Sequence, residues 1–286
     1  MTTMRELEVR PAARDFVAQV RGVDLARVAD AATVAAIRAA WTRHPVLVFP
    51  DQQLDPARLQ SFCAALGPFG HDPYVQPMDG FEHVIEVRRE AGETAPIFGS
   101  LWHSDWSFQA TPPSATVLYG AVVPPLGGDT VFADGYAAWE GLSPVMQGLL
   151  AGLRGVHSAA PSYGPRGLFA RDDATRSMRI VVSAEAERTE THPLVRRHPA
   201  SGRRALFVNH VYTIGIEGLR AEESRALLEF LFKHMTRPEF VHRHRWHPGT
   251  LVMWDNRCVV HYAEGGYEGH ARLMYRTTLA GERPAA

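Results

Sequence analysis

Cysteine is scarce in this sequence, with only Cys63 and Cys258 among 286 residues. Two cysteines cannot form a disulfide framework and do not have the spacing of a zinc site, so we expect both to be buried free thiols. The chain also lacks an apolar run long enough to span a bilayer, and its start lacks the apolar segment of a signal peptide. We therefore expect a cytoplasmic protein without a membrane partner.

An excess of charge of either sign is also absent, since the formal net charge is −1. A near-neutral chain has no overall field that would attract nucleic acid or an anionic membrane, so we expect neither partner. Residues 195–198 (Val-Arg-Arg-His) form a local basic cluster, which we expect to be a solvated face or loop. The hydrophobic content of 45% is that of a globular protein with a substantial core.

The hydrophobic patterns predict many short strands and a few helices. Apolar residues at helical spacing predict helices at residues 30–44, 55–66, 135–153 and 221–234. Short apolar runs between turn residues predict strands at residues 7–9, 17–20, 46–49, 83–87, 115–120, 130–133, 155–158, 205–209, 240–246, 250–254, 258–262 and 273–279. This order favours an α+β, mainly β protein with a double-stranded β-helix (jelly roll) core and flanking helices.

The length is compatible with one domain over residues 1–286, which is the arrangement we expect. Residues 160–191 are polar and show little periodicity. A long irregular stretch of this kind inside a compact domain is often a lid or a binding loop.

Three residues far apart in the sequence have the chemistry of one metal site. His103 and Asp105 occur in Leu-Trp-His-Ser-Asp-Trp, and His261 occurs in Cys-Val-Val-His-Tyr. On an extended segment, His103 and Asp105 would project to the same side. Two imidazoles and one carboxylate on one face of an octahedron leave three open positions, the arrangement used by non-haem Fe(II) oxygenases. We therefore predict that these three residues bind a metal ion and form the catalytic centre.

Each part of this pattern also has an ordinary explanation. A His-x-Asp pair arises readily by chance and could be a hydrogen-bonded surface pair. A single histidine such as His261 is more often a core residue than a ligand. His242 and His244 lie on one face of a predicted strand, but they lack a carboxylate partner at matched spacing, so we interpret them as strand-face residues.

Two arginines follow His261 at a spacing that places both on one face of a strand. Arg272 and Arg276 could each hold a carboxylate, because the planar guanidinium group binds carboxylates in a bidentate manner. Residues 127–130 (Gly-Gly-Asp-Thr) add a tight turn and the hydroxyl group of Thr130 at the start of a strand. Together these features favour a binding site for a carboxylate-bearing co-substrate beside the metal.

The chain resembles the family of Fe(II)- and 2-oxoglutarate-dependent dioxygenases that includes taurine dioxygenase and 2,4-dichlorophenoxyacetate dioxygenase. The resemblance runs from about residue 9 to residue 281. It is carried by the stretches around His103 and His261, by Arg272 and Arg276, and by residues 123–130 (VPPLGGDT), 198–202 (HPASG), 206–209 (LFVN) and 254–257 (WDNR).

The resemblance implies a role for each matching residue. His103, Asp105 and His261 would bind Fe(II), while Thr130 and Arg272 would bind the distal carboxylate of 2-oxoglutarate. The reaction would consume O2 and convert 2-oxoglutarate to succinate and CO2 while the substrate is hydroxylated. Arg276 would pair with an anionic group of the substrate. Homo-oligomers are common among soluble enzymes, and we expect one here.

Differences from taurine dioxygenase bear on the substrate. The early-loop histidine and tyrosine that help hold taurine in that enzyme correspond to His71 and Tyr74, but Asp72 between them would repel a sulfonate that it faced. Trp106 follows the metal aspartate where that enzyme has a smaller residue. Together with Tyr212, these residues predict a pocket for a small organic anion. The resemblance implies a sulfonate such as taurine, an alkyl sulfate or an aryloxyalkanoate.

Three alternatives remain open at this stage. The same scaffold could oxidise an amino acid or a peptide-like intermediate. The chain could be a catalytically silent jelly-roll protein that binds a small anion, or a hydrolase that uses zinc. Function has to be argued from the site and not from the fold alone.

Overall fold

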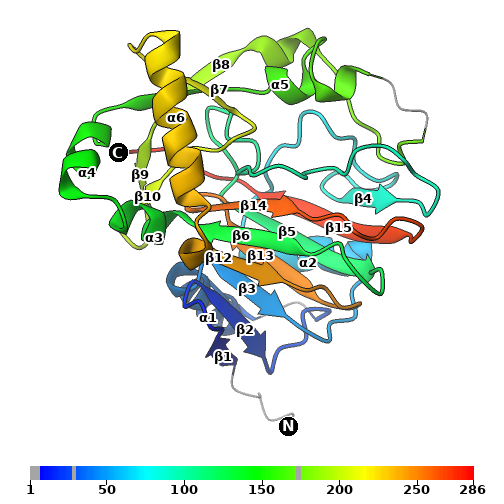
Figure 1. Cartoon of the computed structure of the whole chain (residues 1–286). Coiled ribbons are helices and arrows are strands. Elements are labelled where there is room, and N and C mark those ends of the chain that lie inside the picture. Colours follow the sequence, from blue (N-terminus) through cyan, green and yellow to red (C-terminus); the bar gives the residue numbers. More distant parts are fainter. Residues whose placement is uncertain (1–6, 28–29, 172–174) are drawn as a thin grey trace.

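The computed structural model describes residues 7–27, 30–171 and 175–286, and over these ranges the chain is mainly β with helices on the outside (Figure 1), as predicted. The strands are β1 (Glu8–Pro11), β2 (Val17–Arg21), β3 (Val46–Phe49), β4 (Ile85–Arg89), β5 (Ala115–Val122), β6 (Thr130–Asp134), β7 (Arg154–Ser158), β8 (Thr189–Pro193), β9 (Val195–Arg197), β10 (Arg204–Leu206), β11 (Thr213–Ile216), β12 (Val241–His244), β13 (Leu251–Asp255), β14 (Val259–Ala263) and β15 (Arg272–Leu279). The α-helices are α1 (Ala31–Arg43), α2 (Pro56–Leu66), α3 (Gly135–Glu140), α4 (Pro144–Leu150), α5 (Ala160–Tyr163) and α6 (Ala221–Met235).

The largest sheet has seven strands in the order β1-β2-β3-β13-β5-β15-β4, and all neighbours are antiparallel except β2 and β3. Successive side chains on a strand point to opposite faces. On β13, Leu251 and Met253 therefore pack with α1 and α2, while Val252 and Trp254 point to the other side of the sheet.

A three-stranded sheet, in the order β12-β6-β14, faces the inner side of the large sheet. Phe132 of β6 packs with Trp254 and with Leu118 of β5, so these side chains form the core between the two sheets. The neighbouring positions Ala133 and Val260 point outward and pack in the cluster that includes α6. This alternation turns His261, the residue after Val260, toward the space between the sheets.

The predicted helix at 135–153 is wrong in its extent, because the structure divides it into α3 and α4. The local chemistry explains the break. Gly141 ends α3, the Ser143 side chain caps α4 by accepting from the Met146 N–H, and Pro144 occupies the first turn. The predicted strand at 205–209 is also too long, since β10 ends at Leu206.

The stretch at 160–191 is largely irregular, as predicted. It contains α5 and two short 3₁₀ turns (Leu168–Ala170 and Ala184–Glu187), and it ends in β8. Residues 172–174 of this stretch lie outside the described residues. The strands β8, β9 and β11 were not predicted. They belong to two small sheets, in the orders β11-β7-β8 and β10-β9.

The prediction of a solvated basic cluster at 195–198 holds for the exposed Arg197 but is wrong for Arg196 and His198. Arg196 is 1% exposed, donates to Glu282 Oε1 at 2.5 Å and lies over the Phe207 ring. His198 is equally buried, with its Nε2 3.0 Å from Asp255 Oδ2. The acidic partners Glu282 and Asp255, which come from distant segments, compensate for the burial of Arg196 and His198. The local sequence does not reveal these partners.

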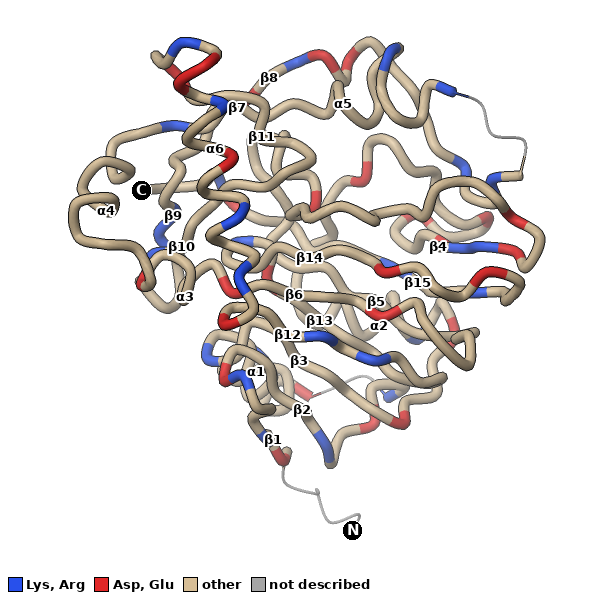
Figure 2. The backbone as a smooth tube through the Cα atoms, in the orientation of Figure 1, with Lys and Arg blue, Asp and Glu red and all other residues tan. Residues whose placement is uncertain are grey.

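The predicted state of the two cysteines agrees with the structure. Cys63 and Cys258 are buried free thiols. Basic and acidic residues are interspersed along the chain (Figure 2), in line with its near-zero net charge. No helix in the described part of the chain is long and apolar enough to cross a membrane.

Candidate metal centre

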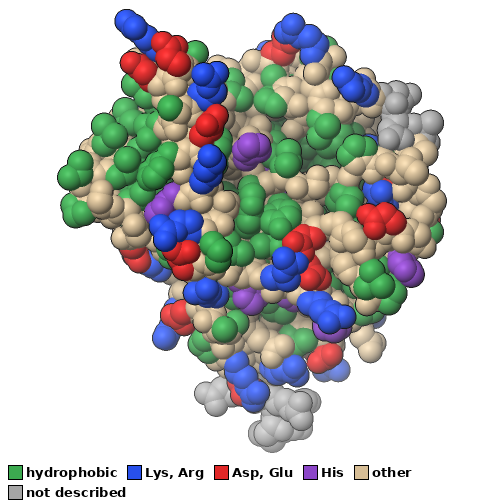
Figure 3. Space-filling view, in the orientation of Figure 1, with side chains coloured by type: hydrophobic (Ala, Val, Ile, Leu, Met, Phe, Trp, Pro, Cys, Tyr) green, Lys and Arg blue, Asp and Glu red, His purple; other side chains and the backbone are tan. Residues whose placement is uncertain are grey.

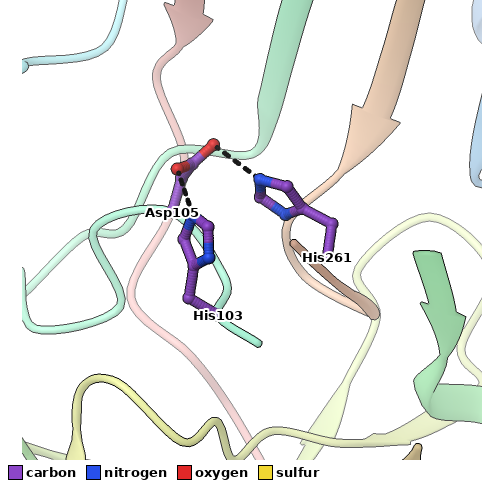
Figure 4. A group of neighbouring side chains, drawn as sticks. All are labelled: His103, Asp105 and His261. Carbon is purple, nitrogen blue, oxygen red and sulfur yellow. Dashed lines mark ion pairs between the residues drawn. The ribbon is translucent and has the colours of Figure 1, made fainter. Parts of the chain in front are cut away.

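His103, Asp105 and His261 lie together as one buried group (Figure 4). Each residue offers one ligand atom, and these atoms all lie within 4.8 Å of one another. His103 Nε2 is 3.5 Å from Asp105 Oδ1, and His261 Nε2 is 3.9 Å from Asp105 Oδ2. The three residues predicted from dispersed motifs are therefore brought within reach of one ion.

A backbone contact brings the two histidines together. The His103 N–H donates to the His261 carbonyl at 2.9 Å, and the His261 N–H donates to the His103 carbonyl at 2.8 Å. A second contact orients the His103 ring, because its Nδ1 lies 2.7 Å from the Leu101 carbonyl oxygen. Since a carbonyl can only accept, Nδ1 carries the proton and the lone pair of Nε2 faces the group.

We had expected His103 and Asp105 to lie on one extended segment, but the extended conformation does not continue to Asp105. Asp105 begins a turn, and the next residue, Trp106, has a positive φ of 48°. The turn directs the carboxylate toward β5, where the Thr116 hydroxyl donates to Asp105 Oδ2 at 2.5 Å. Asn256 Nδ2 in turn donates to Thr116 Oγ1 at 2.9 Å. The Asp105 carboxylate is thus oriented by two layers of hydrogen bonds.

The electrostatics of the group favour the forms that bind a metal. Burial would raise the pKa of Asp105, but the Arg276 guanidinium and the two histidine rings hold it well below its usual range. Burial lowers the pKa of His261 well below its usual range, and the neighbouring His103 ring adds to this effect. An ionised carboxylate and a neutral imidazole are the ligand forms of these side chains.

The donor set therefore fits a divalent metal ion. The lone pair of His103 Nε2 faces a carboxylate oxygen, which is an unfavourable arrangement of two acceptors unless a cation or a proton lies between them. Two nitrogen donors and one carboxylate with open positions suit non-haem iron.

Two cavities, each with an empty volume of about 440 Å³, meet at the group. One, the arginine cavity, is lined by His261, Thr130, Arg272, Arg276 and Trp254 among others. The other, the aromatic cavity, is lined by Phe98, Trp106, Tyr163, Phe169 and Tyr212 among others. His103 and Asp105 line both, so a reactive centre here would be open to two different ligands.

Arg272 is a buried cation without a carboxylate partner among the residues that the structure describes. It is 5% exposed, its Nη2 is 3.4 Å from the Gly128 carbonyl, and its Nε has no hydrogen-bond partner. Burial lowers its pKa. Close by, Thr130 Oγ1 accepts from Trp246 Nε1 at 2.9 Å and keeps its own proton to donate. An uncompensated buried cation beside a free hydroxyl fits an anionic ligand.

Arg276 differs from Arg272 because two carboxylates surround it. Its Nη1 is 2.7 Å from Asp72 Oδ1, and its Nη2 is 3.2 Å from Asp105 Oδ1. The sequence analysis considered an Asp72 side chain that faces a sulfonate, but in the structure this side chain faces Arg276. The cation that we expected to meet a substrate anion is thus already paired within the chain.

The other predicted substrate residues lie at different depths. Trp106 and Tyr212 are buried and line the aromatic cavity. Tyr74 lies behind it, with its ring stacked on that of Tyr163 at 4.8 Å between centroids. His71 is exposed at the surface, where its carbonyl accepts a hydrogen bond from Gln109 Nε2.

The sequence analysis missed Thr116 and Tyr163. A threonine in an apolar run gives no signal of its own. Its position opposite Trp254, the first residue of the 254–257 motif, emerges only from the pairing of β5 with β13. Tyr163 lies in the irregular stretch, where only a general binding role could be predicted.

The fold and the site are those of a mainly β protein with one buried group of two histidines and one carboxylate. The chain belongs to the taurine catabolism dioxygenase TauD, TfdA family, whose model matches residues 8–278. This family is the one that the sequence resemblance indicated.

Individual relatives are similar over nearly their whole length. The chain is 38% identical to the alpha-ketoglutarate-dependent sulfate ester dioxygenase of Pseudomonas putida, covering 98% of this chain and 91% of the relative. It is 36% identical to the alpha-ketoglutarate-dependent 2,4-dichlorophenoxyacetate dioxygenase of Cupriavidus pinatubonensis, covering 92% and 94%. The crystal structure of a taurine dioxygenase from Burkholderia xenovorans superposes with a TM-score of 0.81 at 34% identity, covering 98% and 93%. These likenesses confirm the predicted class of enzyme, a dioxygenase that uses 2-oxoglutarate (alpha-ketoglutarate), and favour it over a silent binding protein.

Proposed function

We propose that this protein is an Fe(II)- and 2-oxoglutarate-dependent dioxygenase that hydroxylates a small organic anion and releases succinate and CO2. The observation that carries the proposal is the buried group of His103, Asp105 and His261, together with Arg272 in the adjoining cavity, which has no carboxylate partner among the described residues. The named activities of the relatives suggest a sulfonate such as taurine, an alkyl sulfate or an aryloxyalkanoate as substrate.

In this proposal His103, Asp105 and His261 hold the iron. Once bound, the iron together with 2-oxoglutarate and O2 supplies the oxidising power for hydroxylation of a substrate carbon. The chain contributes orientation and exclusion of water. The His103–Leu101 and Asp105–Thr116 hydrogen bonds fix two of the ligands, and the Trp254 ring packs against the third at 4.6 Å between centroids.

Arg272 and Thr130 would bind the distal carboxylate of 2-oxoglutarate. A buried guanidinium group that has no carboxylate partner among the described residues can donate to both oxygens of a carboxylate. Its position in the arginine cavity leaves the aromatic cavity for the primary substrate. Binding the two ligands in separate cavities that share His103 and Asp105 would bring the substrate to the metal without displacing the co-substrate.

Trp106 and Tyr212 would form the walls for the primary substrate, and Arg276 would lie at its edge. Aromatic walls supply contact area for an apolar or aryl portion of the substrate. Tyr74 would support the wall through Tyr163. A substrate contact from His71 stays a prediction.

We further propose that the two facing sheets form a double-stranded β-helix (jelly roll) core within a single domain over residues 1–286. The order of the strands supports this, because β13 lies between β3 and β5 although it is far from both in sequence. A homo-oligomer is supported by exposed apolar side chains on α4 (Val145, Leu149) and α6 (Phe230). Figure 3 shows hydrophobic side chains gathered over α4. A cytoplasmic location stays a prediction.

The test is a turnover assay on protein purified without oxygen and loaded with Fe(II). We expect succinate formation that depends on 2-oxoglutarate and O2 and is stimulated by at least one sulfonate, alkyl sulfate or aryloxy acid. A silent binding protein would form no succinate with any of them. A zinc hydrolase would be active with zinc and independent of 2-oxoglutarate, which would contradict the proposal.

A further inference from the structure

Asp72 is held by three donors at the edge of the candidate metal centre. Its Oδ1 accepts from Trp106 Nε1 at 2.5 Å and from Arg276 Nη1 at 2.7 Å, and its Oδ2 accepts from Thr278 Oγ1 at 3.1 Å. The side chain is 12% exposed. A carboxylate with this many partners is fixed in place and does not turn out to solvent.

The early loop approaches β15 closely enough to deliver this carboxylate because residue 70 is a glycine. The Gly70 N–H donates to the Thr278 carbonyl at 2.9 Å. A Cβ atom at position 70 would lie 2.6 Å from Thr278 Oγ1, which is closer than side chains approach one another. Gly70 therefore lets the loop lie against the strand that carries both Thr278 and Arg276.

Trp106 completes the arrangement from the other side. Its backbone has φ 48°, a conformation that is uncommon for a bulky residue and persists only where the surroundings hold it. The Arg276 guanidinium lies 5.1 Å from its ring centroid, and Asp72 accepts the indole N–H. The indole ring thus covers the Asp72–Arg276 ion pair.

The charges at this edge leave little attraction for a further anion. Arg276 is 4% exposed and is paired with Asp72 and Asp105. If Asp105 is engaged by the metal, the Asp72 carboxylate alone still neutralises the guanidinium group. No lysine or arginine occurs among the described residues that line the aromatic cavity, whose walls are mostly apolar.

We propose that Asp72 is a specificity-determining residue, which rests on the function proposed above. By occupying Arg276, it disfavours compact strong-acid substrates, such as short alkyl sulfonates, whose binding depends on a free cation. It favours organic acids that bring an aryl or other extended apolar body into the aromatic cavity, where contact with Trp106 and Tyr212 replaces ion pairing as the main source of affinity.

The test measures binding by calorimetry without O2, in protein loaded with Fe(II) and 2-oxoglutarate. The wild-type protein is expected to bind phenoxyacetate at least about tenfold more tightly than ethanesulfonate. Asp72→Asn should increase the affinity for ethanesulfonate by about tenfold or more, the size of one charge-assisted hydrogen bond. Its uncharged analogue, ethyl methyl sulfone, should show no such gain.

Four further variants separate the charge of Asp72 from other effects. Asp72→Glu keeps the charge, and Asp79→Asn makes the matched change at an exposed aspartate paired with Arg179, so neither should gain affinity. Asp72→Ser replaces the carboxylate with a different uncharged side chain and should behave like Asp72→Asn. Adding Arg276→Gln to Asp72→Asn should abolish the gain.

Two results would overturn the proposal. One is equal affinity of wild-type protein and both uncharged variants for ethanesulfonate, and the other is a gain that survives Arg276→Gln. Because binding is measured without turnover, these results are distinct from failure of the proposed function. That failure would appear as an absence of succinate formation with every substrate.

Discussion

His103 and His261 exchange both of their backbone hydrogen bonds, at 2.9 and 2.8 Å, and their ring centroids lie 4.3 Å apart. This contact joins the loop that carries Asp105 to the inner strand β14. The positions of the two rings are therefore set by the backbone and not by flexible side chains alone, as an ion site with defined geometry requires.

Removal of a ligand should abolish iron binding. We expect His261→Ala to lose stoichiometric Fe(II), measured by metal analysis after anaerobic loading. We also expect 2-oxoglutarate turnover to fall by more than about 100-fold, because the loss of residues that only contact a metal ligand already lowers metal affinity or activity by about 10–100-fold. His270→Ala, a change at an exposed histidine, is the control and should retain iron. Full iron content in His261→Ala would contradict the ligand assignment.

Thr116 should act as a positioning residue for Asp105. Thr116→Val removes the 2.5 Å hydrogen bond to Asp105 Oδ2 while keeping the shape of the side chain. We expect the affinity for Fe(II) to fall by about 10–100-fold, measured by anaerobic competition with a chelator. Thr116→Ser keeps the hydroxyl group and should restore most of the affinity. A purely structural role would instead lower the melting temperature without changing iron affinity.

Arg272 should control the use of 2-oxoglutarate. Arg272→Lys keeps the charge but loses the bidentate fork, so we expect KM for 2-oxoglutarate to rise by about tenfold or more with a smaller change in kcat. Arg245→Lys, at an exposed arginine, is the matched control. An unchanged KM in Arg272→Lys would show that the co-substrate binds elsewhere.

Asp134 should make stability depend on pH. Burial raises the pKa of this α3 cap to about 6, only partly offset by the backbone N–H groups of Tyr136 and Ala137. The folded protein therefore keeps a proton that the unfolded chain releases near pH 4, so this stabilising contribution is lost as pH rises toward 6. Above pH 6 the folded state holds a buried charge.

Asp134→Asn keeps an oxygen that can accept from the Tyr136 N–H, as Oδ1 does now at 2.9 Å, and removes the charge. We expect a gain in the free energy of unfolding that is at most about 3 kcal/mol at pH 8 and about 1 kcal/mol smaller at pH 5. Urea unfolding at the two pH values measures it. Asp30→Asn, at the exposed cap of α1, should show no gain. A gain in the free energy of unfolding that is the same at both pH values would contradict the prediction.

Much of the site was predictable because the types of its residues limit the chemistry that it can perform. Histidine and aspartate in His103-x-Asp105, a later histidine and two following arginines define a limited set of functions. The same holds for mainly β architecture, which follows from short apolar runs and turn residues. The break between α3 and α4 was also readable, since Gly141, Ser143 and Pro144 are ordinary end and start signals, and the predicted single helix overlooked them.

Other features could not be predicted from local sequence, because they depend on partners from distant segments. Arg196 reads as a surface residue, yet Glu282 and Phe207 make its burial tolerable. Asp72 reads as a charge in a loop, yet the approach of that loop to β15 makes it the partner of Arg276.

The sequence by itself determined which side chains could bind a metal and a keto acid, and which face of β14 carries His261, since these follow from residue chemistry and strand periodicity. Only the tertiary structure decided that His261 meets His103, that Arg272 is left without a carboxylate among the described residues and that Arg276 receives two. The physical reason is that a charged side chain is neutralised by the oppositely charged group that folding brings within a few ångströms. The residues next to it in the sequence do not show which group that is.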